Sequence, residues 1–190
     1  MDKEFLLDTN AFYNLLKAMN PDTNEQGAFD DLVTTLNNAK LIVSSITEVE
    51  IISVLEKYAR GSNGSVLKCN CQISPEGHIC QNNRYTAPRK KWNKKRIKAW
   101  LQLIDDIFEG KSQLLTVDIE PFNLTTVAEA KNIITHALIH NFASMDAMIA
   151  ATAKLARDNR RDVTVVTSDK GLKACLSKLN VPYNDIFAAD

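Results

Sequence analysis

The chain has 190 residues, 45% of them hydrophobic and 24% charged, a composition typical of one ordinary soluble domain. No apolar run approaches the roughly 20 residues needed to span a bilayer, and the charged first residues are unlike a signal peptide, so we expect a cytoplasmic protein with no membrane partner. Four cysteines are too few for a disulfide scaffold at this length.

The first part of the chain alternates between strand and helix patterns. A short apolar run that is bounded by turn-forming residues is typical of a buried parallel strand, whereas apolar residues at helical spacing indicate an amphipathic helix. On these grounds we expect strands over residues 5–7 and 41–43, and helices over 11–19, 28–37 and 46–60.

A polar segment interrupts this alternation. Residues 61–88 are rich in Gly, Ser, Asn, Cys and Pro and have little apolar periodicity. Long structureless loops are uncommon inside compact domains and tend to be functional. We therefore predict a single domain over residues 1–190 with an insertion at about 61–95, made of a loop and the start of a basic helix.

The last part of the chain resumes the alternation. Strands that alternate with helices form a mostly parallel sheet covered on both faces, so the expected fold class is α/β. Here we predict strands over 114–117, 163–166 and 181–183. We predict helices over 90–108, 126–140 and 171–179, and a further helix that begins at Ser144. A capping box formed by Thr126 and Glu129 would open the helix over 126–140.

Several acidic residues follow the predicted strands. Asp8 and Asp169 each end an apolar strand, and parallel neighbours would place both at the carboxyl edge, where open α/β sheets bind ligands. Asp146 begins a helix of small residues that can approach the sheet closely, and Glu48 and Glu50 follow the second strand. Four acids at one edge repel each other unless a cation joins them, and oxygen ligands suit Mg²⁺ or Mn²⁺. The pattern indicates phosphoryl chemistry, and no phosphate-binding glycine loop competes with it.

Each aspartate also has a purely structural alternative. Asp8 and Asp169 could cap the helices that follow them, and Asp146 would be a favourable charge at a helix N-terminus. Three separate caps would need no cation and would carry no chemistry.

The second strand leaves a choice between two glutamates. On a helical wheel Glu48 lies with the apolar stripe of its helix, which favours Glu48 as the inward-facing acid. A first-turn residue can instead reach past the helix end, and a helix that starts at Thr47 puts Glu50 in that turn. Capping boxes are available to both glutamates, Ser45 with Glu48 and Thr47 with Glu50. We predict that Glu50 is the site acid.

Four stretches of the chain resemble the four acidic motifs of PIN domains and occur in the same order as in that family. The resemblance is closest to the VapC-like toxin ribonucleases. The stretches are Leu6-Leu7-Asp8-Thr9-Asn10, Ser44-Ser45-Ile46-Thr47-Glu48-Val49-Glu50, Met145-Asp146-Ala147-Met148-Ile149-Ala150-Ala151-Thr152-Ala153 and Val166-Thr167-Ser168-Asp169. The resemblance implies a three-layer α/β/α sandwich with a central parallel sheet. It also implies that Asp8, Glu50, Asp146 and Asp169 are the catalytic residues and the ligands of Mg²⁺ or Mn²⁺.

The family resemblance further implies cleavage of RNA by water, a homodimer and an antitoxin partner. We expect a metal-dependent endoribonuclease, which would be either a toxin or an RNA-processing enzyme. The alternative is a PIN-like module that holds RNA or protein without cutting it. The presence of all four acids favours the enzyme.

A basic segment at residues 84–98 offers a surface for RNA. It carries eight of the 23 basic residues and no acidic residue, so its charge is +8 while the rest of the chain is −8. Clustered cations release counterions from a phosphate backbone, and aromatic side chains stack on bases; the alternative is a solvated helix face. The predicted RNA-binding residues are Arg84, Arg89, Lys90, Lys91, Trp92, Lys94 and Lys95.

The insertion also contains a candidate zinc site. Cys69, Cys71, His78 and Cys80 together offer three thiolates and one imidazole to a tetrahedral ion. The spacing is not a common zinc signature, and the alternative is a loop with reduced thiols.

Overall fold

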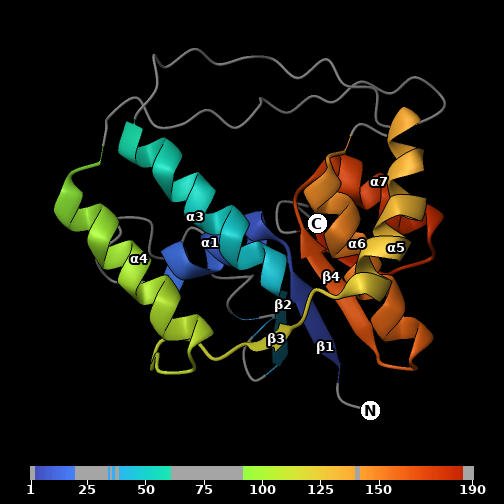
Figure 1. The fold of residues 1–190 in the computed structure, drawn as a ribbon. Coiled ribbons are helices and arrows are strands. Elements are labelled where there is room, and N and C mark those ends of the chain that lie inside the picture. The colour runs from blue at the N-terminus through green and yellow to red at the C-terminus, as the bar shows by residue number, and fades with distance from the viewer. Residues whose placement is uncertain are drawn as a thin grey trace.

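The computed structural model describes residues 3–19, 34, 36, 39–60, 92–139 and 142–185. Within these residues, five strands form one sheet in the order β3-β2-β1-β4-β5, and all neighbouring strands are parallel (Figure 1). The predicted α/β fold is therefore confirmed. The strands are β1 (Glu4–Leu7), β2 (Lys40–Ser44), β3 (Asp118–Glu120), β4 (Val163–Thr167) and β5 (Tyr183–Asp185).

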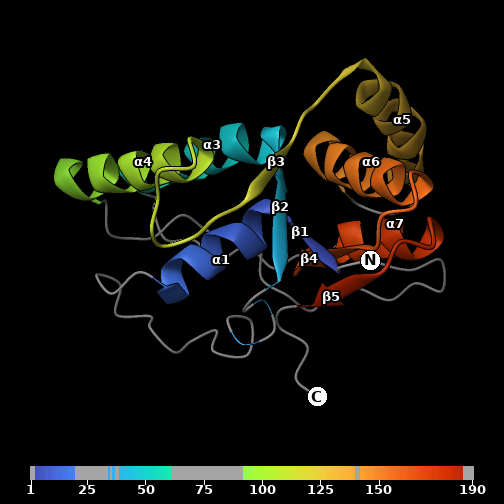
Figure 2. The ribbon, with the colours of Figure 1, turned by 90° about the horizontal axis from the view of Figure 1, so that it is seen from below.

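Helices cover both faces of the sheet, as Figures 1 and 2 show from two directions. One face carries α1 (Thr9–Met19), α3 (Ser45–Arg60) and α4 (Lys94–Phe108). The opposite face carries α5 (Leu124–Ile134) with a following 3-10 turn (Thr135–Leu138), α6 (Ser144–Asp158) and α7 (Lys170–Lys178). This is the expected three-layer arrangement.

Side chains of successive strand residues enter two separate cores. On β1, Phe5 and Leu7 pack with α1, α3 and α4, whereas Leu6 between them packs with α5, α6 and α7. This division follows from the two-residue period of a strand. It also explains why the predicted strands read as continuous apolar runs, because a parallel sheet that is covered on both faces buries every side chain.

Asparagine caps place the starts of two helices differently from the predictions. The helix predicted from Lys90 begins at Lys94, because the Asn93 side chain accepts a hydrogen bond from the Arg96 N–H at 2.8 Å. The helix predicted from Thr126 begins at Leu124 instead, since Asn123 accepts from the Thr126 N–H at 3.0 Å. Asparagine is among the preferred N-cap residues.

The two edge strands also lie later in the chain than predicted. Residues 114–117 form no strand; Leu115 and Val117 are buried in the core, and β3 follows them as a polar segment. At the other edge, the N–H of Val181 closes the end of α7 and Pro182 has no N–H, so β5 starts at Tyr183.

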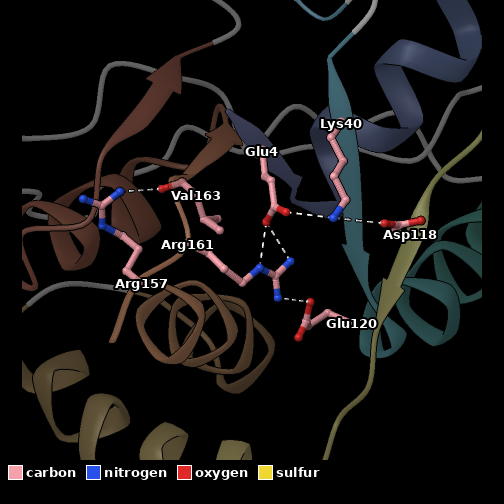
Figure 3. Close-up of polar contacts among 7 residues, drawn as sticks. All are labelled: Glu4, Lys40, Asp118, Glu120, Arg157, Arg161 and Val163. Atoms are coloured by element: carbon pink, nitrogen blue, oxygen red, sulfur yellow. Dashed lines mark hydrogen bonds and ion pairs between the residues drawn. The ribbon is translucent and has the colours of Figure 1, made fainter. Parts of the chain in front are cut away.

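An ion-pair network ties the amino-terminal edge of the sheet together (Figure 3). Arg161 binds Glu4 and Glu120, both at 2.7 Å, and Lys40 bridges Glu4 at 2.8 Å and Asp118 at 3.3 Å. Burial alone would raise the pKa of Glu4, but its bonds to Lys40 and Arg161 lower that pKa below its ordinary value. These contacts join the short strand β3 to β1, β2 and the start of β4.

Several predictions fall outside the described residues. They include most of the helix predicted over 28–37, of which Thr34 and Leu36 are described and helical. The insertion up to residue 91 is also outside, with its four zinc candidates (Cys69, Cys71, His78 and Cys80) and with Arg84, Arg89, Lys90 and Lys91. Among the residues that are described, no helix is long and apolar enough to cross a membrane. The prediction of one domain over the whole chain stays a prediction.

Candidate active site

The register of the central strands brings one set of residues level at the carboxyl edge. Leu7 of β1 pairs with Val43 of β2 and with Val166 of β4. The following residue, Asp8, therefore lies beside the end of each neighbouring strand, and its backbone N–H donates to the Val166 carbonyl at 3.1 Å. Asp8 occupies the centre of the edge at which open α/β sheets bind ligands.

Asp8 is a nearly fully buried acid, with only 3% of its surface exposed. Its Oδ1 accepts the N–H of Ala11 at 2.6 Å and its Oδ2 accepts the hydroxyl of Thr167. Burial, together with the charges of Asp146 and Asp169, raises the pKa of Asp8 to about 7, although the two hydrogen bonds act to lower it. Asp8 is therefore both the cap of α1 and a neighbour of the other two aspartates.

Asp146 and Asp169 approach the same point from the opposite helical layer. Asp146 accepts the N–H of Ala143 at 2.8 Å at the start of α6, and Asp169 accepts the N–H of Leu172 at 2.7 Å as the N-cap of α7. Burial, the Asp169 charge and the Glu50 charge together raise the pKa of Asp146 to about 7. The four predicted acids are thus electrically coupled.

Glu50, rather than Glu48, is the acid that α3 brings to this group. Glu50 Oε2 accepts the hydroxyl of Thr9 at 2.5 Å and acts on the pKa of Asp146. Within the described part of the chain, Glu48 forms no hydrogen bond or ion pair. The buried stripe of α3 is centred on Thr47, Ile51 and Leu55. The helical-wheel argument that favoured Glu48 was therefore wrong by one residue, because Thr47 and not Glu48 lies on the buried face.

The first turn of α3 differs from both predicted capping boxes. The helix begins at Ser45, and the Ser44 hydroxyl accepts the Ile46 N–H at 3.4 Å. Ser45 instead accepts the Phe122 N–H at 3.0 Å, which fixes the segment after β3 against this turn. Thr47 is fully buried, and its hydroxyl finds no hydrogen-bond partner within the described part of the chain.

The donor atoms at this edge suit a hard divalent cation. Four carboxylates and nearby hydroxyl groups are the oxygen ligands that Mg²⁺ and Mn²⁺ prefer, and the described residues place no histidine with them. As they stand, however, no three or more His, Cys, Asp or Glu side chains among the described residues lie close enough together to hold a metal ion. One oxygen each of Asp146, Asp169 and Glu50 lacks a hydrogen bond within these residues, so it is available for ligation while the other stays bonded.

The described part of the predicted RNA surface lies away from the acids. Trp92 lies just before α4. The Arg96 guanidinium carbon lies 4.0 Å from the centroid of the Trp92 ring, and the ring centroid of the buried Trp100 is 5.7 Å from that of Trp92. Lys94 and Lys95 are exposed in the first turn of α4. Figure 2 shows α4 beside α3, with this first turn at the end of the helix farther from the sheet.

Three threonines lie at the edge in positions that the sequence analysis did not single out. Thr9 donates to Glu50, Thr167 donates to Asp8, and Thr47 is buried one helical turn before Glu50. Each stands within three residues of a predicted acid. Their position beside strand ends is the signal that could have identified them.

Comparisons with known proteins agree with this fold. The sequence profile of the family described as PIN domain matches residues 5–175. The curated protein sequences contain no match to the chain. One chain in the crystal structure of FitAcB from Neisseria gonorrhoeae has a TM-score of 0.54 and 18% sequence identity, covering 97% of this chain and 99% of that one. At that identity the likeness concerns the fold alone.

A second solved structure is more distant. One chain in a toxin-antitoxin complex from Klebsiella pneumoniae has a TM-score of 0.42 and 15% sequence identity, covering 86% of this chain and 85% of that one.

Proposed function

The chain belongs to the PIN domain family, and from this premise we propose that it is a metal-dependent endoribonuclease that hydrolyses RNA phosphodiester bonds. One observation carries the proposal, namely that Asp8, Glu50, Asp146 and Asp169 meet at one edge of the sheet although they are far apart in the sequence. Buried like charges with raised pKa values are unfavourable for folding and are typical of functional sites.

The same four residues are the proposed holders of the cation. A bound Mg²⁺ or Mn²⁺ would neutralise negative charge on the scissile phosphate and lower the pKa of an attacking water. The carboxylates contribute by their fixed positions: Asp8 is held by the Ala11 N–H and by Thr167, and Glu50 is held by Thr9. Pre-positioned oxygens reduce the reorganisation that cation binding requires.

The exposed cations of α4 are proposed to hold the RNA away from the point of cleavage. Lys94, Lys95, Arg96 and Lys98 are all exposed, and the first turn of α4 contains no acidic residue. Positive charge at a helix N-terminus is unfavourable for the helix and adds to the attraction of a polyanion. Trp92, which is partly exposed beside Arg96, is proposed to stack on an unpaired base.

The partners implied by the sequence resemblance remain proposals. They are RNA as the substrate, a second copy of the chain in a homodimer, and an antitoxin protein if the enzyme is a toxin. The alternative function is a PIN-like module that binds RNA without cutting it. Retention of all four acids favours cleavage.

Incubation with a mixed RNA pool tests the proposal. We expect cleavage in Mn²⁺ that stops on addition of chelator and leaves 5′-phosphate and 3′-hydroxyl ends. The Asp146→Asn variant serves as the inactive control. Binding of the pool in a gel-shift assay without any metal-dependent new ends would support the non-cleaving module instead.

A further inference from the structure

Thr47 is a fully buried residue whose hydroxyl group has no hydrogen-bond partner among the residues that the structure describes. Buried polar side chains are normally paired, because an unpaired one gives up its hydrogen bonds to water without replacing them. The other threonines around the acidic cluster follow this rule, since Thr9 donates to Glu50 and Thr167 donates to Asp8. The unpaired hydroxyl of Thr47 is therefore an exception that needs a cause.

The strand register places Thr47 at the same edge of the sheet as the acids. Leu7 pairs with Val43, so Asp8 and Ser44 are level, and Thr47 follows within the first turn of α3. In a helix the Cα–Cβ bonds tilt toward the N-terminus, so the Thr47 side chain leans back toward the carboxyl edge of the sheet. Glu50 lies three residues later, a spacing that makes the two side chains neighbours on the helix surface.

Packing alone does not account for a threonine at this position. Thr47 heads the buried stripe that continues through Ile51 and Leu55 into the core of α1, α3 and α4. Valine has almost the same shape and would fill the same space without bringing a polar group into that core. The hydroxyl is thus a cost to the metal-free fold.

We propose that Thr47 is a positioning residue for the divalent cation at the acidic cluster, and that its hydroxyl acquires its hydrogen bond when the hydrated cation binds. Mg²⁺ and Mn²⁺ usually keep several water ligands in proteins, and groups just beyond the ligating carboxylates orient those waters. A hydroxyl group can donate and accept, so it suits a water whichever way that water points. This inference rests on the proposed function, since it requires a cation at this edge.

Three variants test the inference without any RNA: Thr47→Val, Thr47→Ser and Thr152→Val. Mn²⁺ affinity is measured by calorimetric titration, and Tm is measured in chelator.

Thr47→Val should weaken Mn²⁺ binding about 10-fold or more, the size typical for loss of an outer-shell partner, and should raise Tm in chelator because it removes an unpaired buried hydroxyl. Thr47→Ser keeps the hydroxyl and should bind Mn²⁺ as the wild type does. The Thr152 hydroxyl already donates to the Met148 carbonyl at 2.9 Å, so Thr152→Val should leave Mn²⁺ affinity unchanged.

The outcomes separate this inference from the proposed function. If Thr47→Val binds Mn²⁺ as tightly as the wild type, or loses stability in chelator, the hydroxyl serves only the fold and the inference is wrong, while the cation site stands. If the wild type itself binds no Mn²⁺, the cation site and the inference both fail.

Discussion

Single residues at the carboxyl edge combine two roles that the sequence presented as alternatives. Asp8, Asp146 and Asp169 each accept a backbone N–H at the start of a helix, and the charges of Asp146 and Asp169 also raise the pKa of Asp8. The partial positive charge at a helix N-terminus favours a carboxylate there. Three helix starts that meet at one edge therefore bring three acids together.

Replacement of Asp146 by asparagine tests the cluster. Asp146→Asn removes a charge that burial and the neighbouring acids disfavour, so Tm in chelator at pH 8 should rise by roughly 2–4 °C for each kcal/mol of relief. Mn²⁺-dependent RNA cleavage should fall to background. Asp158→Asn, at the exposed far end of α6, is the matched control and should retain cleavage. Wild-type cleavage by Asp146→Asn would exclude the proposed site.

The two glutamates of α3 provide a second matched pair. Glu50→Gln should lose most Mn²⁺-dependent cleavage, because Glu50 contacts Thr9 and is coupled to Asp146. Glu48→Gln should retain activity and should change the free energy of unfolding by no more than about 0.5 kcal/mol, since Glu48 caps nothing within the described residues. Cleavage assays and urea titrations measure both quantities. An inactive Glu48→Gln beside an active Glu50→Gln would move the site by two residues.

At the scale of elements, α4 separates a packed face from a charged one. Trp100, Ile104 and Ile107 are buried in the core, while the first turn and a half presents exposed cations to solvent. Like charges at helical spacing destabilise a helix slightly, by about 0.2–0.5 kcal/mol per pair. The proposed compensation for this cost is attraction of RNA.

Neutralising that surface should weaken RNA binding without affecting the cation site. The triple variant Lys94→Gln, Lys95→Gln, Lys98→Gln should reduce the slope of log affinity against log salt by about 0.7 for each phosphate of a single strand that the variant no longer neutralises. Mn²⁺ affinity should stay at the wild-type value. A control triple variant changes three exposed lysines on other elements: Lys111→Gln, Lys131→Gln and Lys178→Gln. Equal slopes for the two triple variants would show that α4 is ordinary solvated surface.

At the scale of the whole molecule, the two edges of the sheet respond to pH in opposite directions. Asp8 and Asp146 have pKa values of about 7 in the folded chain against 3.8 unfolded, so between these pH values the folded state binds more protons and stability falls as pH rises. The pKa of Glu4 is lowered in the folded chain, so its contribution to stability is lost as pH falls below 4.5. These opposing contributions balance near about pH 4, where the metal-free protein should be most stable with respect to these three groups.

Urea titrations in chelator check this pH dependence. From pH 5 to pH 8 the free energy of unfolding should decrease by on the order of 3–6 kcal/mol, at about 1.4 kcal/mol per pKa unit over two coupled carboxyls. Mn²⁺ at pH 8 should recover stability, because it binds only the folded state. The double variant Asp8→Asn, Asp146→Asn should flatten the profile. A wild-type stability that rises from pH 5 to pH 8 would contradict the raised pKa values.

The helices and central strands, and the acids that follow them, could be predicted because their signals are local. An apolar run that stops at Asp8 or Asp169 marks a strand end by itself, and the apolar stripes of α1 and α4 mark their buried faces. The edge strands could not be predicted in the same way. β3 is a polar segment held by ion pairs to Lys40 and Arg161, which are distant in the sequence.

The amino-acid sequence by itself determined which acidic residues are the candidates for the chemistry, because residue type and the order of strands and helices are written along the chain. Only the tertiary structure decided which side chains meet. Thr9 reaches Glu50 across 41 residues, and Thr167 reaches Asp8 across 159. Such contacts depend on strand register and on the exact face that a helix turns inward, and a change of one residue in either would redirect every side chain at the edge.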